Sequence, residues 1–382
     1  MTEVRLKPFH KGMTTYQVAL AVPVIVLGLV SGCAHAPLAT ETNSSQPALV
    51  EQIEKRKPAN LRPTSLPDQD RWQALYDYAD ALDLSSPSVS LKISGGGTSV
   101  YAVIQENGRA TGAILPENES TSVSGEIFAW TLSRALGVSE LFQPSVYRPL
   151  SGPSLQAFLT VVPTSPMDKK PREANRLAIL KRTRKNPNGL PAVYKSWDLK
   201  PADYDAIEGA QKINELHVLP GSSNTISSML QCNGPRPSAY TRVSFNGGSN
   251  TEFEIARELS SIALIDALTQ QYDRYTGGNI QTVNRGGRVT FVAYDNGGTW
   301  GGTGWTKKNL AMITRFDSGV ANQILAMDDF FRSRIPYLGL RSEREFATAF
   351  DFAQSPKDLS NFKQSLKLVA EHIRRYQGCW FY

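Results

Sequence analysis

Histidine and cysteine are scarce in this chain, and their scarcity argues against several kinds of site. The 382 residues include four histidines and three cysteines. His35, His217 and His372 lie far apart, so none of them has the short ligand spacing of a zinc site. Neither Cys232 nor Cys379 has a histidine beside it, and the GxSxG turn of serine hydrolases is missing. Zinc-dependent, cysteine-nucleophile and α/β-hydrolase chemistries are therefore disfavoured.

Long apolar runs are also scarce, and the one at the N-terminus predicts an export signal. Residues 18–30 (VALAVPVIVLGLV) follow a short basic stretch and are fewer than the about 20 residues that span a bilayer. Small residues then lead to Cys33 in an ending, Val-Ser-Gly-Cys, that resembles a lipobox. The pattern predicts a lipoprotein signal peptide over residues 1–32 and lipidation of Cys33. An ordinary cleaved signal with an incidental cysteine is the alternative.

These features predict a lipid-anchored protein of the bacterial cell envelope, with the membrane as one partner. Ala34 follows the cysteine where an aspartate would favour the inner membrane, so the outer membrane is preferred. Residues 33–66 are rich in Ala, Pro, Ser and Thr and poor in large apolar side chains. Such a segment buries too little surface to offset its chain entropy, so we expect a flexible tether.

The basic surplus of the chain is modest and concentrated in one segment. There are 41 Lys and Arg against 35 Asp and Glu, and many of the cations lie between Lys169 and Lys185. Such a run is either a solvated face or a contact with anionic lipid, nucleotide phosphate or an acidic partner. Without zinc-finger spacing or interleaved aromatic and basic residues, nucleic acid is not an expected partner. Cys232 and Cys379 form either a disulfide or free thiols.

Hydrophobic periodicity and turn residues divide the rest of the chain into a strand-rich part and a helical part. The first part is predicted to contain helices at 69–82 and 124–136 and strands at 89–93, 99–104, 111–115, 144–147 and 155–162. The second part is predicted to contain helices at 252–271 and 356–376 and a hairpin with strands at 280–283 and 289–294. This order predicts an α+β fold with two lobes.

Two short motifs carry the chemistry, and phosphoryl transfer suits them. Residues 273–279 (DRYTGGN) follow the long helix, and residues 292–298 (VAYDNGG) end the hairpin. Phosphoryl transfer needs a carboxylate near the acceptor hydroxyl and oxygen ligands for a metal-bound nucleotide. Asp273 would be the acid/base or acceptor-orienting group. Asn279 and Asp295 would bind Mg²⁺, which takes few protein carboxylates and keeps water or phosphate oxygens.

The two motifs resemble those of the atypical kinase superfamily, which includes phosphatidylinositol 3- and 4-kinases, HipA toxin kinases and secretory-pathway Golgi kinases. Three further stretches match in the same order. SGGGTSVYAVI resembles the glycine-rich loop and supplies Gly95, Gly96 and Gly97 for the nucleotide. SGEIFAWTLSRALGV resembles the helix that provides a glutamate, here Glu126. SLQAF at 154–158 resembles the strand that leads into the hinge between the lobes.

The resemblance implies a protein-kinase-like fold and a set of ligands. Residues 67–163 would form the small N-lobe with its antiparallel sheet. Residues 164–382 would form the mainly helical C-lobe, with an insertion at about 165–250. The resemblance also implies ATP with Mg²⁺ or Mn²⁺ and catalytic roles for Asp273 and Arg274.

The chain departs from the kinase pattern at two positions. The third strand in those families ends in a lysine before a proline, and this lysine holds the nucleotide phosphates. Here Leu115 stands before Pro116, so Glu126 is expected to lack its usual partner unless Lys92 or Arg109 reaches it. In addition, Asn279 comes one residue later after the aspartate than the pattern has it.

Three functions remain open from the sequence. The first is a phosphotransferase that acts on a protein, lipid or small-molecule acceptor. The second is a pseudokinase that binds without catalysis, favoured by the missing lysine and by the poor ATP supply of the periplasm. The third is a structural lipoprotein in which Asp273-Arg274 caps a helix end and residues 295–297 form an ordinary turn.

Overall fold

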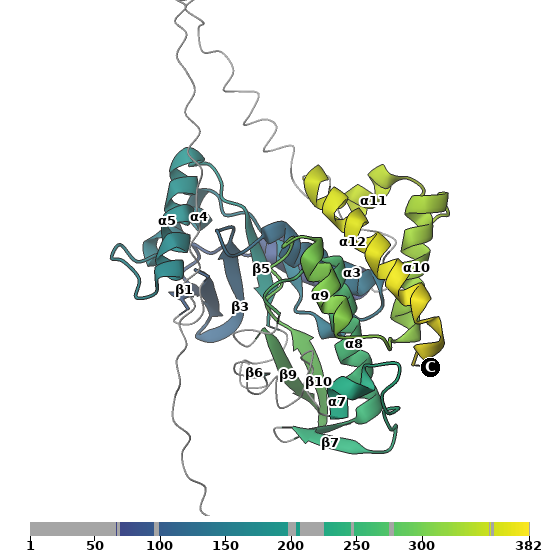
Figure 1. Cartoon of the computed structure of the whole chain (residues 1–382). Helices are drawn as coiled ribbons and strands as arrows, with labels where there is room; N and C mark the ends of the chain where they lie inside the picture. Colours follow the sequence, from purple (N-terminus) through teal and green to yellow (C-terminus); the bar gives the residue numbers. More distant parts are fainter. Residues whose placement is uncertain are drawn as a thin grey trace, which may run out of the picture. The chain divides into compact units, whose positions relative to one another are not determined.

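The computed structural model (Figure 1) describes residues 66, 69–94, 99–197, 204–206, 225–245, 248–274, 279–350, 352 and 355–381. These residues belong to one compact unit, Lys57–Tyr382. Within them no helix has both the length and the apolar character needed to cross a bilayer. The signal peptide expected at 1–32, Cys33, the tether and the glycines at 95–97 lie outside the described residues.

The first sheet is antiparallel throughout and has the strand order β1-β2-β3-β5-β4. Its strands are β1 (Val89–Ile93), β2 (Ala102–Glu106), β3 (Arg109–Pro116), β5 (Ala192–Ser196) and β4 (Ser145–Tyr147). Asn107 and Gly108 both have positive φ, as a tight hairpin turn between β2 and β3 requires. Three consecutive strands therefore form a meander, and the sheet is completed by strands from further along the chain.

Strand β5 shows that the predicted N-lobe boundary at residue 163 is wrong. It pairs with β3 and β4 although it follows them by many residues, so the N-lobe sheet extends to Ser196. The intervening chain forms two helices, α4 (Gly152–Val161) and α5 (Lys170–Lys185). Part of the predicted insertion is therefore N-lobe structure.

The strand predicted over 155–162, including the match to a hinge strand at 154–158, is also wrong, because this stretch lies in helix α4. Pro153 occupies the first turn, where a proline costs a helix no hydrogen bond. Leu155 and Phe158 are both buried and lie three residues apart, which places them on one helical face. A short apolar run is ambiguous between strand and helix, and here helical packing decides.

Helix α3 (Val123–Ala135) lies almost wholly inside the molecule. Ser122 caps its start by accepting a hydrogen bond from the Gly125 amide, at 3.1 Å. Every residue of the helix except Ser124 is buried. Gly125 is in tight contact with Thr299, because a Cβ at this glycine would lie 1.9 Å from the threonine hydroxyl oxygen. The helix start is therefore fixed against the loop that follows β10.

The second sheet has the order β6-β9-β10-β8-β7 and is mixed, because β8 and β10 run parallel. Its strands are β6 (Tyr204–Ala206), β7 (Arg242–Phe245), β8 (Gly248–Thr251), β9 (Ile280–Arg285) and β10 (Arg288–Ala293). The accompanying helices are α7 (Thr225–Met229), α8 (Glu252–Leu268), α9 (Thr303–Ala311), α10 (Ser318–Ser333), α11 (Glu343–Ala349) and α12 (Pro356–Arg375). The β9–β10 hairpin and the helices at 252 and 356 begin where the sequence predicts them, apart from a one-residue shift at β10.

Helix α8 is the central element of the second part. Thr251 caps it through the Glu254 amide, and its last three turns are buried on every side. It packs against α3, α9, α12 and strand β10. One continuous apolar cluster runs from the first sheet through α3 and α8 to α12. The end of α8, where Asp273 follows, is therefore held by the core of the molecule.

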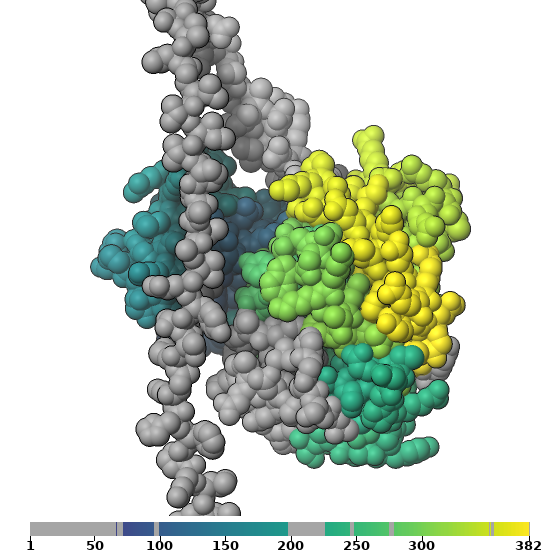
Figure 2. Space-filling view, viewed as in Figure 1, coloured from purple at the N-terminus to yellow at the C-terminus, as the bar shows by residue number. Residues whose placement is uncertain are grey.

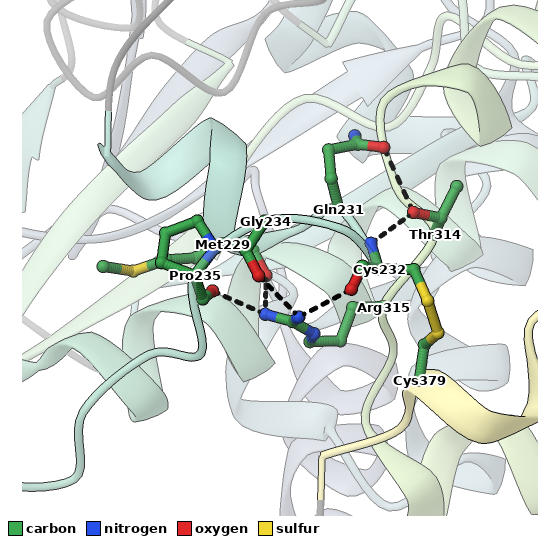
Figure 3. Close-up of a disulfide and its surroundings, with 8 residues drawn as sticks. All are labelled: Met229, Gln231, Cys232, Gly234, Pro235, Thr314, Arg315 and Cys379. Carbon is green, nitrogen blue, oxygen red and sulfur yellow. Dashed lines mark hydrogen bonds between the residues drawn. A yellow bond between two sulfur atoms is a disulfide. The ribbon is translucent and has the colours of Figure 1, made fainter.

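A disulfide joins Cys232 to Cys379, the pairing that the sequence left open (Figure 3). The two Cα atoms lie 5.3 Å apart, within the usual range for a bridge. Beside it, the Arg315 guanidinium donates hydrogen bonds to four backbone carbonyls, those of Met229, Cys232, Gly234 and Pro235. The segment before β7 is thus held both covalently and by one buried cation.

We predict that the double variant Cys232→Ser/Cys379→Ser lowers the free energy of unfolding by about 2–5 kcal/mol, because a bridge across a long segment restricts the unfolded chain. Urea denaturation with and without reductant measures this. In a Cys33→Ser background, thiol labelling of the denatured, unreduced protein should find no free cysteine. Full labelling of Cys232 and Cys379 before reduction would contradict the bridge.

Candidate active site

Lys195 and Glu126 form a buried ion pair between strand β5 and helix α3. The Lys195 ammonium nitrogen lies 2.6 Å from Glu126 Oε1, and the two side chains are 3% and 0% exposed. The same ammonium donates a 3.0 Å hydrogen bond to the Tyr294 carbonyl, directly after β10. One cation therefore contacts the first sheet, α3 and the end of the hairpin. The ammonium is therefore bonded to the carbonyl that directly precedes Asp295.

This pair corrects the expectation that Glu126 lacks a cation partner. Leu115 does stand where the family has its lysine, on β3 opposite Val193. Lys195 of β5 pairs with Ala113 of β3, and Ala113 lies two residues before Leu115. Residues two apart on a strand share a face, so Lys195 and Leu115 lie on the same face of the sheet. Neither Lys92 nor Arg109 takes the role, and both are exposed. Glu126 therefore does have a cation partner, and β5 supplies it.

Asp295 brings a second carboxylate to this pair. Burial raises the pKa of Glu126 to about 7; Lys195 opposes that shift, and the charge and a hydrogen bond of Asp295 add to it. Asp295 itself is half-buried, and its Oδ1 accepts a hydrogen bond from the Gly297 amide. Both Glu126 oxygens are buried, and the Lys195 ammonium lies within ion-pair distance of one of them. The group carries more negative than positive charge.

Asp273 and Asn279 lie next to Asp295, as the two motifs predicted. Burial raises the pKa of Asp273 most, and the nearby charge of Asp295 raises it further, while a hydrogen bond from Asn279 lowers it. The Asn279 side-chain amide also donates a 2.7 Å hydrogen bond to the Asp273 carbonyl. Residues 275–278 between them are outside the described part of the chain. The three predicted residues therefore meet at one place.

Arg274 positions these residues and does not contact a ligand. Its side chain is 1% exposed and pairs with the buried Asp266 of α8 at 2.9 Å. It also donates hydrogen bonds to the carbonyls of Asn279 and Asp295, each at 3.0 Å, and to the Asn296 side chain at 2.6 Å. These contacts give Arg274 a positioning role, and its catalytic role stays a prediction.

Gln271 is a further positioning residue, and neither motif includes it. Its Oε1 accepts a hydrogen bond from the Asp273 amide at 3.1 Å, and its Nε2 donates one to the Asp295 carbonyl at 3.3 Å. Gly298 makes room for it, because a Cβ there would lie 2.4 Å from Gln271 Oε1. The available sequence signal was its position, in a pair of glutamines shortly before the Asp273 motif.

The arrangement fits an oxygen-liganded divalent cation bound together with phosphate. Glu126, Asp273 and Asp295 supply three carboxylates, and Lys195 is the cation among them. Among the residues that the structure describes, no group of three or more His, Cys, Asp or Glu side chains could hold a metal ion. Asp295, Asn279 and phosphate oxygens would therefore hold the ion, which suits Mg²⁺ or Mn²⁺. The nucleotide role of Gly95–Gly97 stays a prediction.

We predict that removal of the Lys195–Glu126 pair changes how stability depends on pH. The pKa of Glu126 in the folded protein, about 7, exceeds the value of an unfolded glutamate, about 4.3. The folded state therefore binds this proton more tightly, so the contribution of Glu126 to stability increases as pH falls from about 7 towards 4.5. The double variant Glu126→Gln/Lys195→Met should lose about 1–3 kcal/mol of that increase.

Urea denaturation from pH 5 to pH 8 measures this difference, and the double variant leaves no unpaired buried ammonium behind. Glu258 also has its pKa raised to about 7, chiefly by burial, but it is present in both proteins and cancels. Parallel stability curves for the two proteins would contradict the assignment.

Comparison with known proteins finds similarity in structure only. No protein-family model and no curated protein sequence matches the chain. The Golgi casein kinase aligns with a TM-score of 0.50 and 12% identity over 89% of this chain and 91% of the kinase. The same kinase with Mn/ADP bound gives 0.49 and 12% over 91% and 93%, and hydra Fam20 with sugar gives 0.48 and 13% over 80% and 91%. The chain has a two-lobed, kinase-like α+β fold similar to that of the Golgi casein kinase, which confirms the predicted fold class.

Proposed function

We propose that the protein is an ATP-dependent phosphotransferase that uses Mg²⁺ or Mn²⁺. The observation that carries this proposal is the buried Lys195–Glu126 pair beside Asp273, Asn279 and Asp295. A fold alone does not specify a function, but this set combines a phosphate-binding cation with carboxylates at the same place. The acceptor is a hydroxyl group of a protein, lipid or small molecule.

In this proposal each side chain has a separate task. Lys195 neutralises phosphate charge, and Glu126 keeps its ammonium in place. Asp273 accepts the proton of the acceptor hydroxyl, and its raised pKa suits a general base better than an ordinary aspartate. Asp295 and Asn279 would hold the divalent cation, which would supply further charge neutralisation on the phosphoryl group. Arg274 and Gln271 hold the backbones of Asp273 and Asp295 at a fixed separation.

The pseudokinase alternative loses one of its two reasons. It was favoured by the absence of a lysine at residue 115, and Lys195 now provides the ammonium that pairs with Glu126. The poor ATP supply of the periplasm remains the other argument for a pseudokinase. We further propose that Cys33 carries a lipid and that the protein acts at the bacterial envelope, with the outer membrane preferred. The sequence pattern at residues 30–33 supports this part of the proposal.

The binding prediction separates the roles of Asp295 and Asp273. The purified full chain should melt at a higher temperature in ATP with Mg²⁺ or Mn²⁺, by an amount that grows with ligand concentration. Asp295→Ala should abolish the shift, because it removes a carboxylate beside the metal. Asp273→Ala should keep most of the shift and lose about 100-fold or more of any phosphotransfer.

Asp168→Ala, an exposed aspartate away from these motifs, is the matched control and should behave as wild type. The titration should extend to millimolar nucleotide with both metals. An unchanged melting temperature over that whole range would contradict nucleotide binding and with it the proposed function.

The catalytic prediction concerns the relocated lysine. Lys195→Met should lower kcat/KM for ATP by about 100-fold or more, because it removes a preorganised charge from a buried site. Lys92→Met, an exposed lysine of the same sheet, should stay within about twofold of wild type. In the Lys195→Met background, Leu115→Lys should restore part of the activity, since it returns an ammonium to the same face of the sheet. Equal activity of Lys195→Met and Lys92→Met would contradict the assignment.

A further inference from the structure

Helix α5 has one face fixed to the molecule and one face turned to solvent. The inner face is buried and consists of Arg172, Asn175, Arg176 and Ile179. Asn175 donates a 3.0 Å hydrogen bond to the Ser120 hydroxyl, and Arg176 donates one of 3.2 Å to the Pro163 carbonyl. Figure 2 shows this teal part of the chain on the left side of the folded unit. The helix is therefore held in place, and its outer face has a fixed direction.

The outer face is a basic ridge, defined here as Lys170, Ala174, Leu177, Lys181, Arg184 and Lys185. These residues recur at helical spacing and are all exposed. Leu177 is 51% exposed in the middle of the ridge, which makes it one of the few large apolar side chains so exposed among the described residues. The ridge therefore combines four cations with an apolar centre along a helix of 16 residues, about 24 Å long.

The ridge cations have no internal task that accounts for them. No ion pair or hydrogen bond of these four side chains occurs within the described residues, although other cations of the helix are paired. Glu173 is engaged by Arg176, and Glu117 by Arg182, so neither carboxylate is free to neutralise the ridge. Lys170, and Lys169 at the N-cap position, even oppose the helix dipole. Arg184 and Lys185, by contrast, lie in the last turn, where cations favour the helix dipole.

We propose that the basic ridge of α5 docks on a membrane surface rich in anionic lipid head groups. A groove would indicate a peptide, but the ridge is the convex outer face of one helix, and neither described pocket includes it. A plane of phosphate groups fits a convex face with Lys170 at one end and Lys181, Arg184 and Lys185 towards the other. Lys and Arg side chains at a bilayer surface are attracted to anionic lipid, and Leu177 supplies an apolar contact at the level of the head groups. This inference does not rest on the proposed phosphotransferase activity.

The test places a polarity-sensitive fluorophore on the ridge of the full chain. In a Cys33→Ser background, Ala174→Cys gives a single labelling site, since Cys232 and Cys379 are bridged. The labelled protein is added to vesicles of phosphatidylcholine alone or with about one third phosphatidylglycerol, at about 0.1 M salt. We expect at least about threefold stronger emission with the anionic vesicles, and loss of that difference at about 1 M salt because the charges are then screened.

Two double variants make the test specific for the ridge. Lys181→Glu/Arg184→Glu should reduce emission on anionic vesicles to the level seen with phosphatidylcholine. Lys357→Glu/Lys367→Glu changes the net charge equally, at exposed lysines of α12. Its emission on anionic vesicles should stay within about twofold of that of the protein with an unchanged ridge. Equal emission on both kinds of vesicle, or an equal response of the two double variants, would overturn the proposal. Circular dichroism of each protein checks that the fold is intact.

Discussion

The ammonium of Lys195 joins the parts of the site that come from distant regions of the chain. It lies on β5, pairs with Glu126 of α3 and donates to the carbonyl that precedes Asp295. Burial of an unpaired charge would cost several kcal/mol, so each partner depends on the others for its own burial. Because Lys195 of the first sheet contacts the end of the β9–β10 hairpin, it fixes the distance between these two elements. In the proposed function, phosphate would bind across that distance.

Arg274 is a second buried cation nearby, and it has a different role. Arg274 directs its guanidinium at the Asp266 carboxylate and at backbone carbonyls, so its charge is fully used within the protein. Arginine suits this task because its planar donors can bind several fixed acceptors at once. Lys195 instead has a compact charge that pairs with Glu126 and with one carbonyl, and in the proposed function it would also bind phosphate. Arg274 therefore positions backbone groups, whereas Lys195 is the cation that we propose binds phosphate.

Local patterns in the sequence predicted much of the fold, and non-local contacts account for the rest. Strand β1 has the predicted bounds because alternation and turn residues define it within a few positions. The stretch at 155–162 was mistaken for a strand because its apolar residues have no periodicity that excludes a helix. Asp273, Asn279 and Asp295 were found through their motifs. Lys195 was missed because only strand pairing brings it to Glu126, although a lone lysine in an apolar strand was a usable signal.

The disulfide has a consequence for the order in which the molecule is completed. Cys379 follows Cys232 by 147 positions, and α8, the β9–β10 hairpin and α9 to α12 all lie between them. No bridge can therefore close until every one of these elements has been synthesised and has left the ribosome. Arg315 is made earlier and can already gather the four carbonyls around Cys232. The bridge then ties the end of the described chain to the segment before β7.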